Sequence, residues 1–250
     1  MKYVAIIPAR YGSTRFPGKP LVRLKGQPII QHVYERVSNI IPDTYVATDD
    51  HRIEEAVLKF GGKVIMTSPD HKSGTDRCNE ALSLIGEEYD IVINVQGDEP
   101  FIAASQIKSL QACFEDPDTE IATLVKPFTE DMGIEALKNP NSPKVVIDKN
   151  RFALYFSRSV IPYLRGVDEE KWLSSHQYYK HIGLYAYRKE TLRTITHLPV
   201  GTLEKSESLE QLRWLEAGYS IRVGVTDIET IGIDTPEDLV KAEAFIDILS

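Results

Sequence analysis

The residues best suited to chemistry lie in the first connection of the chain, residues 6–20, which read IIPARYGSTRFPGKP. Arg10, Arg15 and Lys19 give this loop three cations, while two glycines and three prolines make it stiff and sharply turned. No acidic residue precedes Glu35, although the whole chain has a formal net charge of −8. A basic loop after a strand of an acidic protein predicts a polyphosphate site. The alternative is a solvated surface loop, but such loops normally mix charges of both signs.

The loop matches neither of the two common phosphate-binding motifs. Five residues separate Gly12 from Gly18, where a Walker A loop has four, and Pro20 stands where that motif needs Ser or Thr. The G-x-G-x-x-G fingerprint is also absent from the sequence. Pro17 and Pro20 predict that no helix forms here. The cations are therefore expected to act from an extended loop, where they would suit a triphosphate.

Two acidic positions could complete such a site by holding a metal ion. Asp98 follows the apolar run 91–95, and ligands of open α/β sheets collect at the carboxyl ends of strands. A Gly-Asp turn is common, but the basic loop at another strand end favours a metal ligand. Mg²⁺ typically takes one or two protein carboxylates. Asp234 could be the second ligand, or it could cap the helix that starts at Pro236; the sequence leaves both roles open.

A third polar cluster, Ser73-Gly74-Thr75-Asp76-Arg77, stands between a predicted strand and a predicted helix. Ser73 or Thr75 could cap that helix, whereas Arg77 could reach a nucleotide base or phosphate. His181 stands out because aromatic and basic residues flank it. The other histidines are interpreted as structural: His32, His51, His71, His176 and His197. Neither a Ser-His-Asp order nor a zinc-ligand spacing occurs.

Length, composition and charge limit the classes of protein to which this chain can belong. The 250 residues, 42% of them hydrophobic, can build one large domain or one domain with an elaboration. No apolar run reaches the length of a membrane span and the chain begins in a strand signal, so we expect a cytoplasmic protein. The acidic balance and the lack of an aromatic-basic platform argue against nucleic-acid binding. Cys78 and Cys113 are predicted to be small core residues.

The elements that must position these residues alternate between strand and helix in the first half. Hydrophobic runs predict strands, and helical spacing predicts the helices between them. The predicted strands are 3–7, 44–48, 63–66, 91–95 and 121–125, and the predicted helices are 30–40, 53–60, 78–85 and 107–114. This alternation predicts an α/β fold, with a mostly parallel mixed sheet flanked by helices and short right-handed crossovers.

The pattern changes near Pro127. Residues 127–190 predict a β-rich insertion in the core sheet, with a hairpin that turns at 148–150. An antiparallel lobe or a dimer platform would fit this segment. The α/β pattern then returns with a helix through 209–215, a strand at 220–225 and a final helix from Pro236.

These segments together resemble the sugar-activating cytidylyltransferases, and within them the members that act on 3-deoxy-manno-octulosonate (Kdo). The resemblance runs through nearly the whole chain, with its motifs in order. It is carried by 7–21, 46–50, 70–77, 94–100, 153–158, 181–185, 207–212 and 232–236. It implies a single Rossmann-like nucleotidyltransferase domain over 1–250. The implied activity is Mg²⁺-dependent transfer of CMP from CTP to the anomeric 2-hydroxyl of Kdo, with release of pyrophosphate, for lipopolysaccharide synthesis.

The resemblance also implies roles for single residues. The nucleotide-binding set is Arg10, Gly12, Ser13, Arg15, Lys19, Ser73, Arg77 and Gln96. The metal ligands are Asp98 and Asp234, and the catalytic residues are Arg10, Lys19 and Asp98. The sugar-binding set is Arg158, His181, Tyr185, Glu210 and Gln211. Arg158 suits the sugar carboxylate, because a guanidinium binds a carboxylate through two hydrogen bonds.

The family members are homodimers, and the resemblance implies that 127–190 contributes to dimerisation and sugar binding. Two alternatives stay open. One is the same reaction with another acidic sugar, such as a sialic acid or 8-amino-Kdo. The other is a non-catalytic, nucleotide-binding regulatory module, against which the presence of both Asp98 and Asp234 argues.

Overall fold

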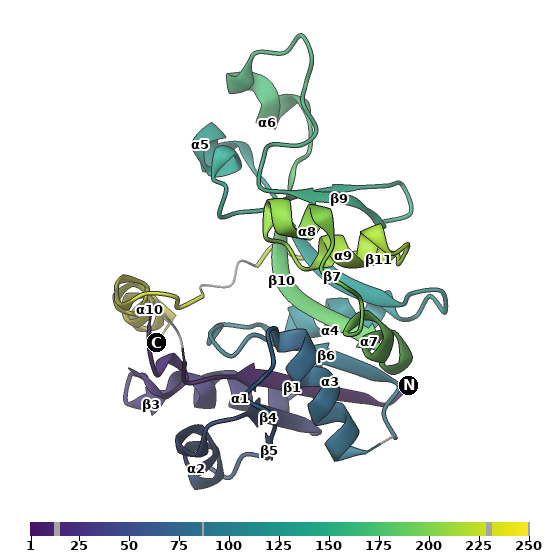
Figure 1. Cartoon of the computed structure of the whole chain (residues 1–250). Coiled ribbons are helices and arrows are strands. Elements are labelled where there is room, and N and C mark those ends of the chain that lie inside the picture. The colour runs from purple at the N-terminus through teal and green to yellow at the C-terminus, as the bar shows by residue number, and fades with distance from the viewer. Residues whose placement is uncertain (13–15, 87, 229–231, 250) are drawn as a thin grey trace. The chain divides into compact units, whose positions relative to one another are not determined.

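The computed structural model describes residues 1–12, 16–86, 88–228 and 232–249 (Figure 1). It divides into two compact units. Unit 1 comprises Met1–Ile107, Ala186–Thr196 and Thr230–Ser250, and unit 2 comprises Lys108–Tyr185 and His197–Glu229. The predicted phosphate-binding and metal-binding residues all belong to unit 1, whereas the predicted sugar-binding residues all belong to unit 2.

Unit 1 is built on a parallel sheet in the order β6-β1-β4-β5. Its strands are β1 (Tyr3–Ala9), β4 (Thr44–Thr48), β5 (Val64–Met66) and β6 (Ile91–Asn94). All four residues of β6 are buried, as the continuous apolar run 91–95 predicts for a strand covered on both faces. The four strands predicted for this part of the chain are confirmed, with ends that differ by one or two residues.

Helices connect these strands. Unit 1 contains α1 (Ile29–Ser38), α2 (His51–Lys59), α3 (Gly74–Ile85), α7 (Lys189–Ile195) and α10 (Pro236–Leu249), together with the hairpin of β2 (Arg23–Leu24) and β3 (Gln27–Pro28). Two further elements, α4 (Ala104–Cys113) and β10 (Tyr179–Arg188), have residues in both units. The helices predicted at 30–40, 53–60, 78–85 and 107–114 correspond to α1, α2, α3 and α4.

The order of the strands determines where a ligand can bind. The chain steps from β1 through α1 to β4 and through α2 to β5, and α3 then returns it to β6 on the other side of β1. Because such crossovers are right-handed, α1 and α2 cover one face of the sheet and α3 covers the other. The direction of winding reverses between β1 and β6. Open α/β sheets bind ligands at the carboxyl ends of the strands beside such a reversal.

The end of the opening loop differs from its prediction. The two prolines, Pro17 and Pro20, predict that no helix forms here, and this is wrong: Lys19–Leu21 forms a 3₁₀ turn, η1. Proline is tolerated in the first turn of a helix, because its missing N–H would have no partner there. Gly18 enters the turn in the left-handed region, at φ +70°, and its N–H donates to the Tyr11 carbonyl over 2.9 Å. Lys19 therefore projects from a fixed turn.

Unit 2 is richer in antiparallel strands. Its strands are β7 (Ile121–Pro127), β8 (Lys144–Ile147), β9 (Ala153–Ser157), β11 (Ile221–Val225) and the part of β10 up to Tyr185. β11 pairs with β7 in parallel, and β8 pairs antiparallel with both β9 and β10. The predicted hairpin that turns at 148–150 is therefore confirmed. So is the α/β fold with a mixed, mostly parallel sheet.

The helices of unit 2 are short. They are α5 (Gly133–Lys138), α6 (Trp172–Ser175), α8 (Thr202–Glu207) and α9 (Gln211–Glu216), with the 3₁₀ turns η2 (Glu130–Met132) and η3 (Glu169–Lys171). Phe128, Leu137, Trp172 and Tyr178 form an apolar cluster that anchors α5 and α6 to the strands. Aromatic side chains of the 127–190 segment thus supply a local core.

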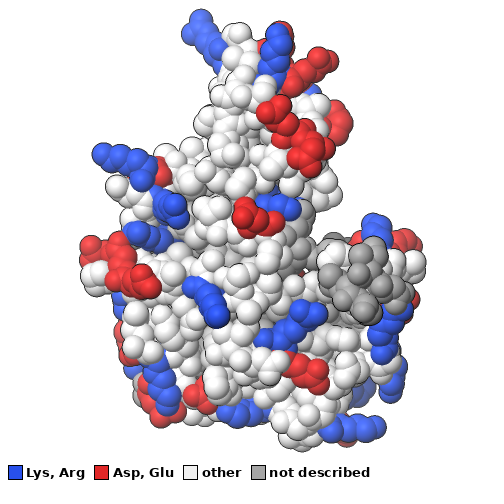
Figure 2. Space-filling model, turned by 180° about the vertical axis from the view of Figure 1, so that it is seen from behind, with Lys and Arg blue, Asp and Glu red and all other residues white. Residues whose placement is uncertain are grey.

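Acidic and basic side chains are interspersed over the face drawn in Figure 2. The cations of the opening sequence meet acids from later in the chain, as in the 2.7 Å ion pair of Lys2 with Glu88. Cys78 and Cys113 are buried and free, which confirms their prediction as core residues. In the described part of the chain, no helix has the length and apolar character needed to cross a membrane.

Candidate active site

A cavity of about 260 Å³ lies at the carboxyl ends of β1 and β6 in unit 1. Five segments that are far apart in the sequence form its wall. They contribute Pro8, Ala9, Arg10, Lys19, Pro20, His71, Lys72, Ser73, Gly74, Arg77, Gln96, Gly97, Asp98 and Asp234. The cavity therefore brings together the basic loop, the Ser73 cluster and both acidic positions that the sequence singles out.

The centre of the site is an ion pair between Lys19 and two carboxylates. The Lys19 Nζ donates to Asp98 Oδ2 over 2.5 Å and to Asp234 Oδ1 over 2.9 Å. The Lys19 side chain is 14% exposed and that of Asp98 is 28% exposed. Burial alone would lower the pKa of Lys19, but the charges and hydrogen bonds of Asp98 and Asp234 outweigh it and raise that pKa. The ammonium is therefore fully charged at neutral pH.

Asp234 is placed by the backbone around it. The N–H of Ile233 donates to the Asp98 carbonyl over 2.9 Å, which fixes the segment before α10 against the loop after β6. Thr235 caps α10: its Oγ1 accepts from the Asp238 N–H over 3.3 Å, and the Asp238 carboxylate accepts from the Thr235 N–H over 3.1 Å. This reciprocal pair is a capping box. The cap that the sequence allowed for Asp234 is thus supplied by its neighbour, and the Asp234 carboxylate faces Lys19.

The two carboxylates suit a magnesium ion. Both reach the same ammonium, so both can reach one cation placed between them. Among the described residues, no group of three or more His, Cys, Asp or Glu side chains is arranged to hold a metal. A pair of carboxylates fits Mg²⁺, because this ion keeps waters and binds substrate phosphates in addition to one or two protein ligands.

Gly97 allows the loop after β6 to approach β1. A Cβ atom at this position would lie 3.1 Å from the Pro8 carbonyl oxygen and 3.5 Å from side-chain atoms of Ile7 and Ile30. Any larger residue would therefore push the two strand ends apart. The close approach brings Asp98 and Lys19 into the same cavity.

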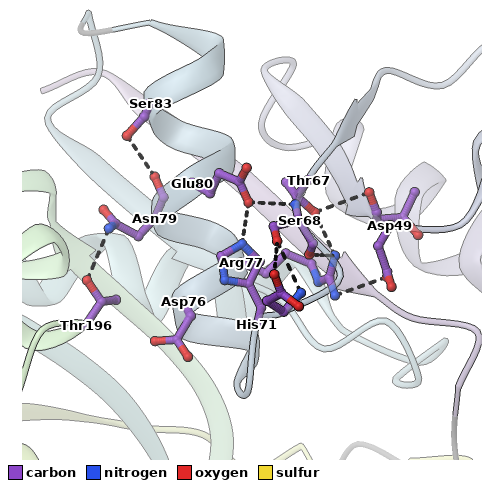
Figure 3. Close-up of polar contacts among 12 residues, drawn as sticks. Asp49, Thr67, Ser68, His71, Asp76, Arg77, Asn79, Glu80, Ser83 and Thr196 are labelled. Carbon is purple, nitrogen blue, oxygen red and sulfur yellow. Dashed lines mark hydrogen bonds and ion pairs between the residues drawn. The ribbon is translucent and has the colours of Figure 1, made fainter. Parts of the chain in front are cut away.

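The segment before α3 forms a second polar network, shown in Figure 3. Arg77, only 4% exposed, donates to Thr67 Oγ1 over 2.6 Å and pairs with Asp49 Oδ1 at 3.1 Å. These contacts join α3 to the residues that follow β4 and β5. Ser73 caps α3, because its Oγ accepts from the Asp76 N–H over 3.1 Å. The capping role that the sequence allowed for Ser73 is therefore present.

Glu80 ties the same segment to α3. Its Oε2 accepts from the Ser68 N–H over 2.8 Å and also contacts His71 Nε2 (Figure 3). Burial alone would raise the pKa of Glu80, but these two hydrogen bonds and nearby positive charge lower it. Glu80 is therefore a carboxylate at neutral pH.

Five of the predicted nucleotide-binding residues line the cavity. Those that line the cavity are Arg10, Lys19, Ser73, Arg77 and Gln96. Gly12 is not part of the described lining, and a Cβ there would meet no described atom within 4 Å. Ser13 and Arg15 lie outside the described residues. Sequence reasoning missed His71 and Lys72, although both stand directly before Ser73 in the segment it singled out.

In unit 2, His181 and Tyr185 lie on β10 with their rings 5.4 Å apart. The Thr123 hydroxyl lies 3.0 Å from His181 Nε2 and donates to backbone carbonyls of β10. Desolvation lowers the pKa of His181 to about 3, so the imidazole is neutral at physiological pH. Burial, followed by the charge of Glu210, raises the pKa of Tyr185 well above its ordinary value. Both rings can therefore offer hydrogen bonds without carrying charge.

Gln211 and Glu210 stand at the start of α9. Gln211 is only 4% exposed, and its Nε2 has no hydrogen-bond partner among the residues the structure describes. A buried amide without a partner costs free energy unless a ligand or water satisfies it. The Glu210 carboxylate lies 3.9 Å from Arg213, which itself pairs with Glu204. The Gln211 amide can therefore still donate a hydrogen bond to a water or a ligand.

Arg158 makes contacts that the sequence did not predict. Its Nε donates to the Glu207 carbonyl over 2.6 Å, and its two terminal nitrogens donate to the carbonyls of Pro140 and Ser208. The Glu207 carboxylate in turn accepts from the Arg158 N–H over 2.9 Å. The guanidinium therefore holds three backbone segments of unit 2 together.

The sequence model of the cytidylyltransferase family matches residues 4–228. The chain belongs to this family. It is 65% identical over 246 residues to a 3-deoxy-manno-octulosonate cytidylyltransferase of Phocaeicola vulgatus, with 98% of each chain covered. A more distant cytidylyltransferase, from Shewanella baltica, is named for 8-amino-3,8-dideoxy-manno-octulosonate; it is 46% identical, with 97% of this chain and 98% of that one covered.

A solved structure supports the assignment of the chain to this family. The fold matches that of a CMP:2-keto-3-deoxy-manno-octonic acid synthetase complexed with CTP, with a TM-score of 0.90, 44% sequence identity and full coverage of both chains. The predicted family is confirmed. The cavity in unit 1 is accordingly the candidate active site of a cytidylyltransferase.

Proposed function

We propose that this cytidylyltransferase transfers CMP from CTP to the anomeric 2-hydroxyl of Kdo and releases pyrophosphate. The observation that carries the proposal is the Lys19 ammonium held between Asp98 and Asp234 at the reversal point of the sheet. A cation and two acids there suit a nucleoside triphosphate and its metal. The 65% identity to a relative named for Kdo supports the choice of sugar.

The reaction needs no protein nucleophile. The hydroxyl oxygen of Kdo attacks the α-phosphorus in line and forms the new P–O bond, while the bond to the bridging oxygen of the β-phosphate breaks and pyrophosphate leaves. The hydroxyl proton passes to solvent. Arg10 and Lys19 neutralise the charge that develops on the leaving phosphates, and Arg77 and Gln96 hold the cytidine. Gly12, Ser13, Arg15 and Ser73 complete the proposed nucleotide-binding set.

Asp98 and Asp234 would hold Mg²⁺ in this proposal. When bound, the ion supplies charge neutralisation at the phosphates and draws the two anionic substrates together. With the two carboxylates engaged by the ion, Lys19 would be free to donate to a phosphate oxygen. The catalytic residues of the proposal are Arg10, Lys19 and Asp98.

The acidic sugar would bind to residues of unit 2. The neutral His181, the Tyr185 hydroxyl and the buried Gln211 amide are suited to sugar hydroxyls, and Glu210 can accept from one. Arg158 is the proposed partner of the sugar carboxylate. We further propose that residues 1–250 act as one catalytic domain in a cytoplasmic homodimer, with residues 127–190 at the dimer contact.

Incubation of the purified chain with CTP, Kdo and Mg²⁺ tests the proposal. We expect pyrophosphate release and a product with the mass of CMP-Kdo. Asp98→Asn should lower kcat by about 100-fold or more, because a proposed ligand of the Mg²⁺ that neutralises the phosphates is lost. Glu237→Gln removes one charge from an exposed position of α10 and is the matched control. No turnover with Kdo, combined with turnover of another acidic sugar, would overturn the choice of substrate.

A second candidate substrate is 8-amino-Kdo. The 46% identical relative from Shewanella baltica, named for that sugar, favours it. A competition assay with equal concentrations of the two sugars separates the candidates. We expect CMP-Kdo to be the main product. CTP binding without turnover of any acidic sugar would instead support a non-catalytic regulatory module.

A further inference from the structure

Two residues of the cation-rich cavity wall, His71 and Lys72, have no role in the reaction as set out above. Four fixed cations line the cavity, Arg10, Lys19, Lys72 and Arg77, against two acids, Asp98 and Asp234. His71 lines the same wall beside Lys72, and its side chain is 19% exposed. The wall is thus suited to an anion, and His71 is positioned to contact it.

Glu80 determines how His71 is oriented. An ionised carboxylate has only acceptor atoms, so His71 must donate to Glu80 through Nε2–H (Figure 3). The remaining polar atom of the ring is then Nδ1. Glu80 also accepts from the Ser68 N–H, which fixes the backbone that carries His71. Ring and backbone are therefore held by one carboxylate of α3.

We propose that His71, oriented by Glu80, is a further nucleotide-contacting residue whose Nδ1 donates to a phosphate oxygen of CTP. The proposal rests on the proposed function, since it takes CTP as the ligand of this cavity. Phosphate oxygens only accept hydrogen bonds. In the proposed complex the imidazole donates from Nδ1 to the phosphate and from Nε2 to Glu80. His71 contacts the substrate, whereas Glu80 is a positioning residue that acts through it.

The opposing explanation is that His71 only fastens its loop to α3. Two substitutions separate the explanations. His71→Gln places a polar group near the position of Nε2, so the link to Glu80 is kept and the pocket-side donor is lost. His71→Asn places a donor near the position of Nδ1, so the pocket-side donor is kept and the link to Glu80 is lost. If His71 only fastens the loop to α3, His71→Gln should keep the wild-type affinity for CTP and His71→Asn should not.

The measurements are the Kd of CTP by calorimetry without Kdo, and the KM and kcat of the full reaction. His71→Gln is expected to raise the Kd and the KM for CTP by about tenfold, the effect of losing one hydrogen bond to a charged group, with the KM for Kdo unchanged. His71→Asn should recover part of that loss. Glu80→Gln should weaken CTP binding by a smaller factor, because only the orientation of His71 is lost.

The exposed pair of His51 and Glu54 supplies the matched control. His51 Nδ1 lies 2.8 Å from Glu54 on α2, and neither residue is in the described lining of the cavity. His51→Gln is therefore expected to leave CTP binding unchanged. Wild-type affinity for CTP in His71→Gln would overturn the proposal. Wild-type protein that binds CTP but transfers CMP to no acidic sugar would overturn the proposed function alone, and protein that does not bind CTP would overturn both.

Discussion

The Lys19 ammonium lies 2.5 Å from Asp98 Oδ2, although 79 residues separate the two in the sequence. The same ammonium reaches Asp234, which is 215 residues away. Lys19 therefore neutralises the two acids that are proposed to hold Mg²⁺. In the proposed function, an ion and Lys19 would compete for the same carboxylates, and Lys19 would be free to donate to the phosphates once the metal and CTP are bound.

Replacing Lys19 should separate metal binding from catalysis. Lys19→Met removes the competing charge, so the affinity of the protein alone for Mn²⁺, used as a probe for Mg²⁺, should rise by about tenfold, the equivalent of about 1.4 kcal/mol. The kcat for CMP transfer should fall by about 100-fold, because the cation at the leaving phosphates is lost. Electron paramagnetic resonance of Mn²⁺ measures the affinity. An unchanged Mn²⁺ affinity would show that Lys19 does not compete with the ion for Asp98 and Asp234.

The neighbours Asp234 and Thr235 should have separable effects. Thr235→Val removes the cap of α10 and should lower the free energy of unfolding by about 1 kcal/mol, with kcat close to that of the wild type. Asp234→Asn leaves the Thr235–Asp238 capping box in place, so kcat should fall and stability should change little. Urea unfolding and steady-state kinetics on both variants check this. A stability loss in Asp234→Asn that exceeds that of Thr235→Val would contradict the assignment.

The sequence predicted the parts of unit 1 that depend on local pattern. Strands and helices each have a characteristic hydrophobic period, and phosphate-binding loops and metal-binding acids come directly after strands. Lys19 and Asp98 could therefore each be identified from the sequence around them. Their mutual contact could not, because it depends on how β1, β6 and the segment before α10 come together. The choice of Thr235 over Asp234 as the cap is likewise a matter of side-chain geometry.

Other features had no pattern to reveal them. The 3₁₀ turn at Lys19–Leu21 arises because Gly18 adopts a positive φ, which sets Pro20 within a first turn. The sequence predicts a structural role for His71, because a lone histidine has no spacing signal. Its place in the cavity follows from Glu80, which stands nine residues later on α3.

Substitution by alanine should destabilise the protein at Gly97 and leave its stability nearly unchanged at Gly12. A Cβ at Gly97 would lie 3.1 Å from the Pro8 carbonyl oxygen, so Gly97→Ala should lower the free energy of unfolding by about 1–3 kcal/mol and weaken CTP binding. A Cβ at Gly12 would meet nothing within 4 Å among the residues that the structure describes, so the change in stability for Gly12→Ala should stay within about 0.5 kcal/mol. Thermal melts with and without CTP compare the two. Equal melting temperatures would contradict the close-approach role of Gly97.

His181 should make the protein less stable at acidic pH. Desolvation lowers its pKa to about 3, whereas an unfolded histidine titrates near 6.5. Between these values the unfolded chain binds the extra proton, so the free energy of unfolding falls as the pH drops below about 6.5, by at most about 1.4 kcal/mol per pH unit. His181→Gln removes this titration. Urea unfolding at pH 7 and pH 5 should show a smaller loss for the variant than for the wild type.

The exposed His51 gives the control for this experiment, because its shift has the opposite sign. The hydrogen bond that His51 donates to Glu54 raises the pKa of His51, so its contribution to stability is present at low pH and is lost as the pH rises through the folded pKa. His51→Gln should therefore not reduce the loss at acidic pH. If His181→Gln and His51→Gln both lose as much stability as the wild type between pH 7 and pH 5, the neutral state of His181 is not the cause of that loss.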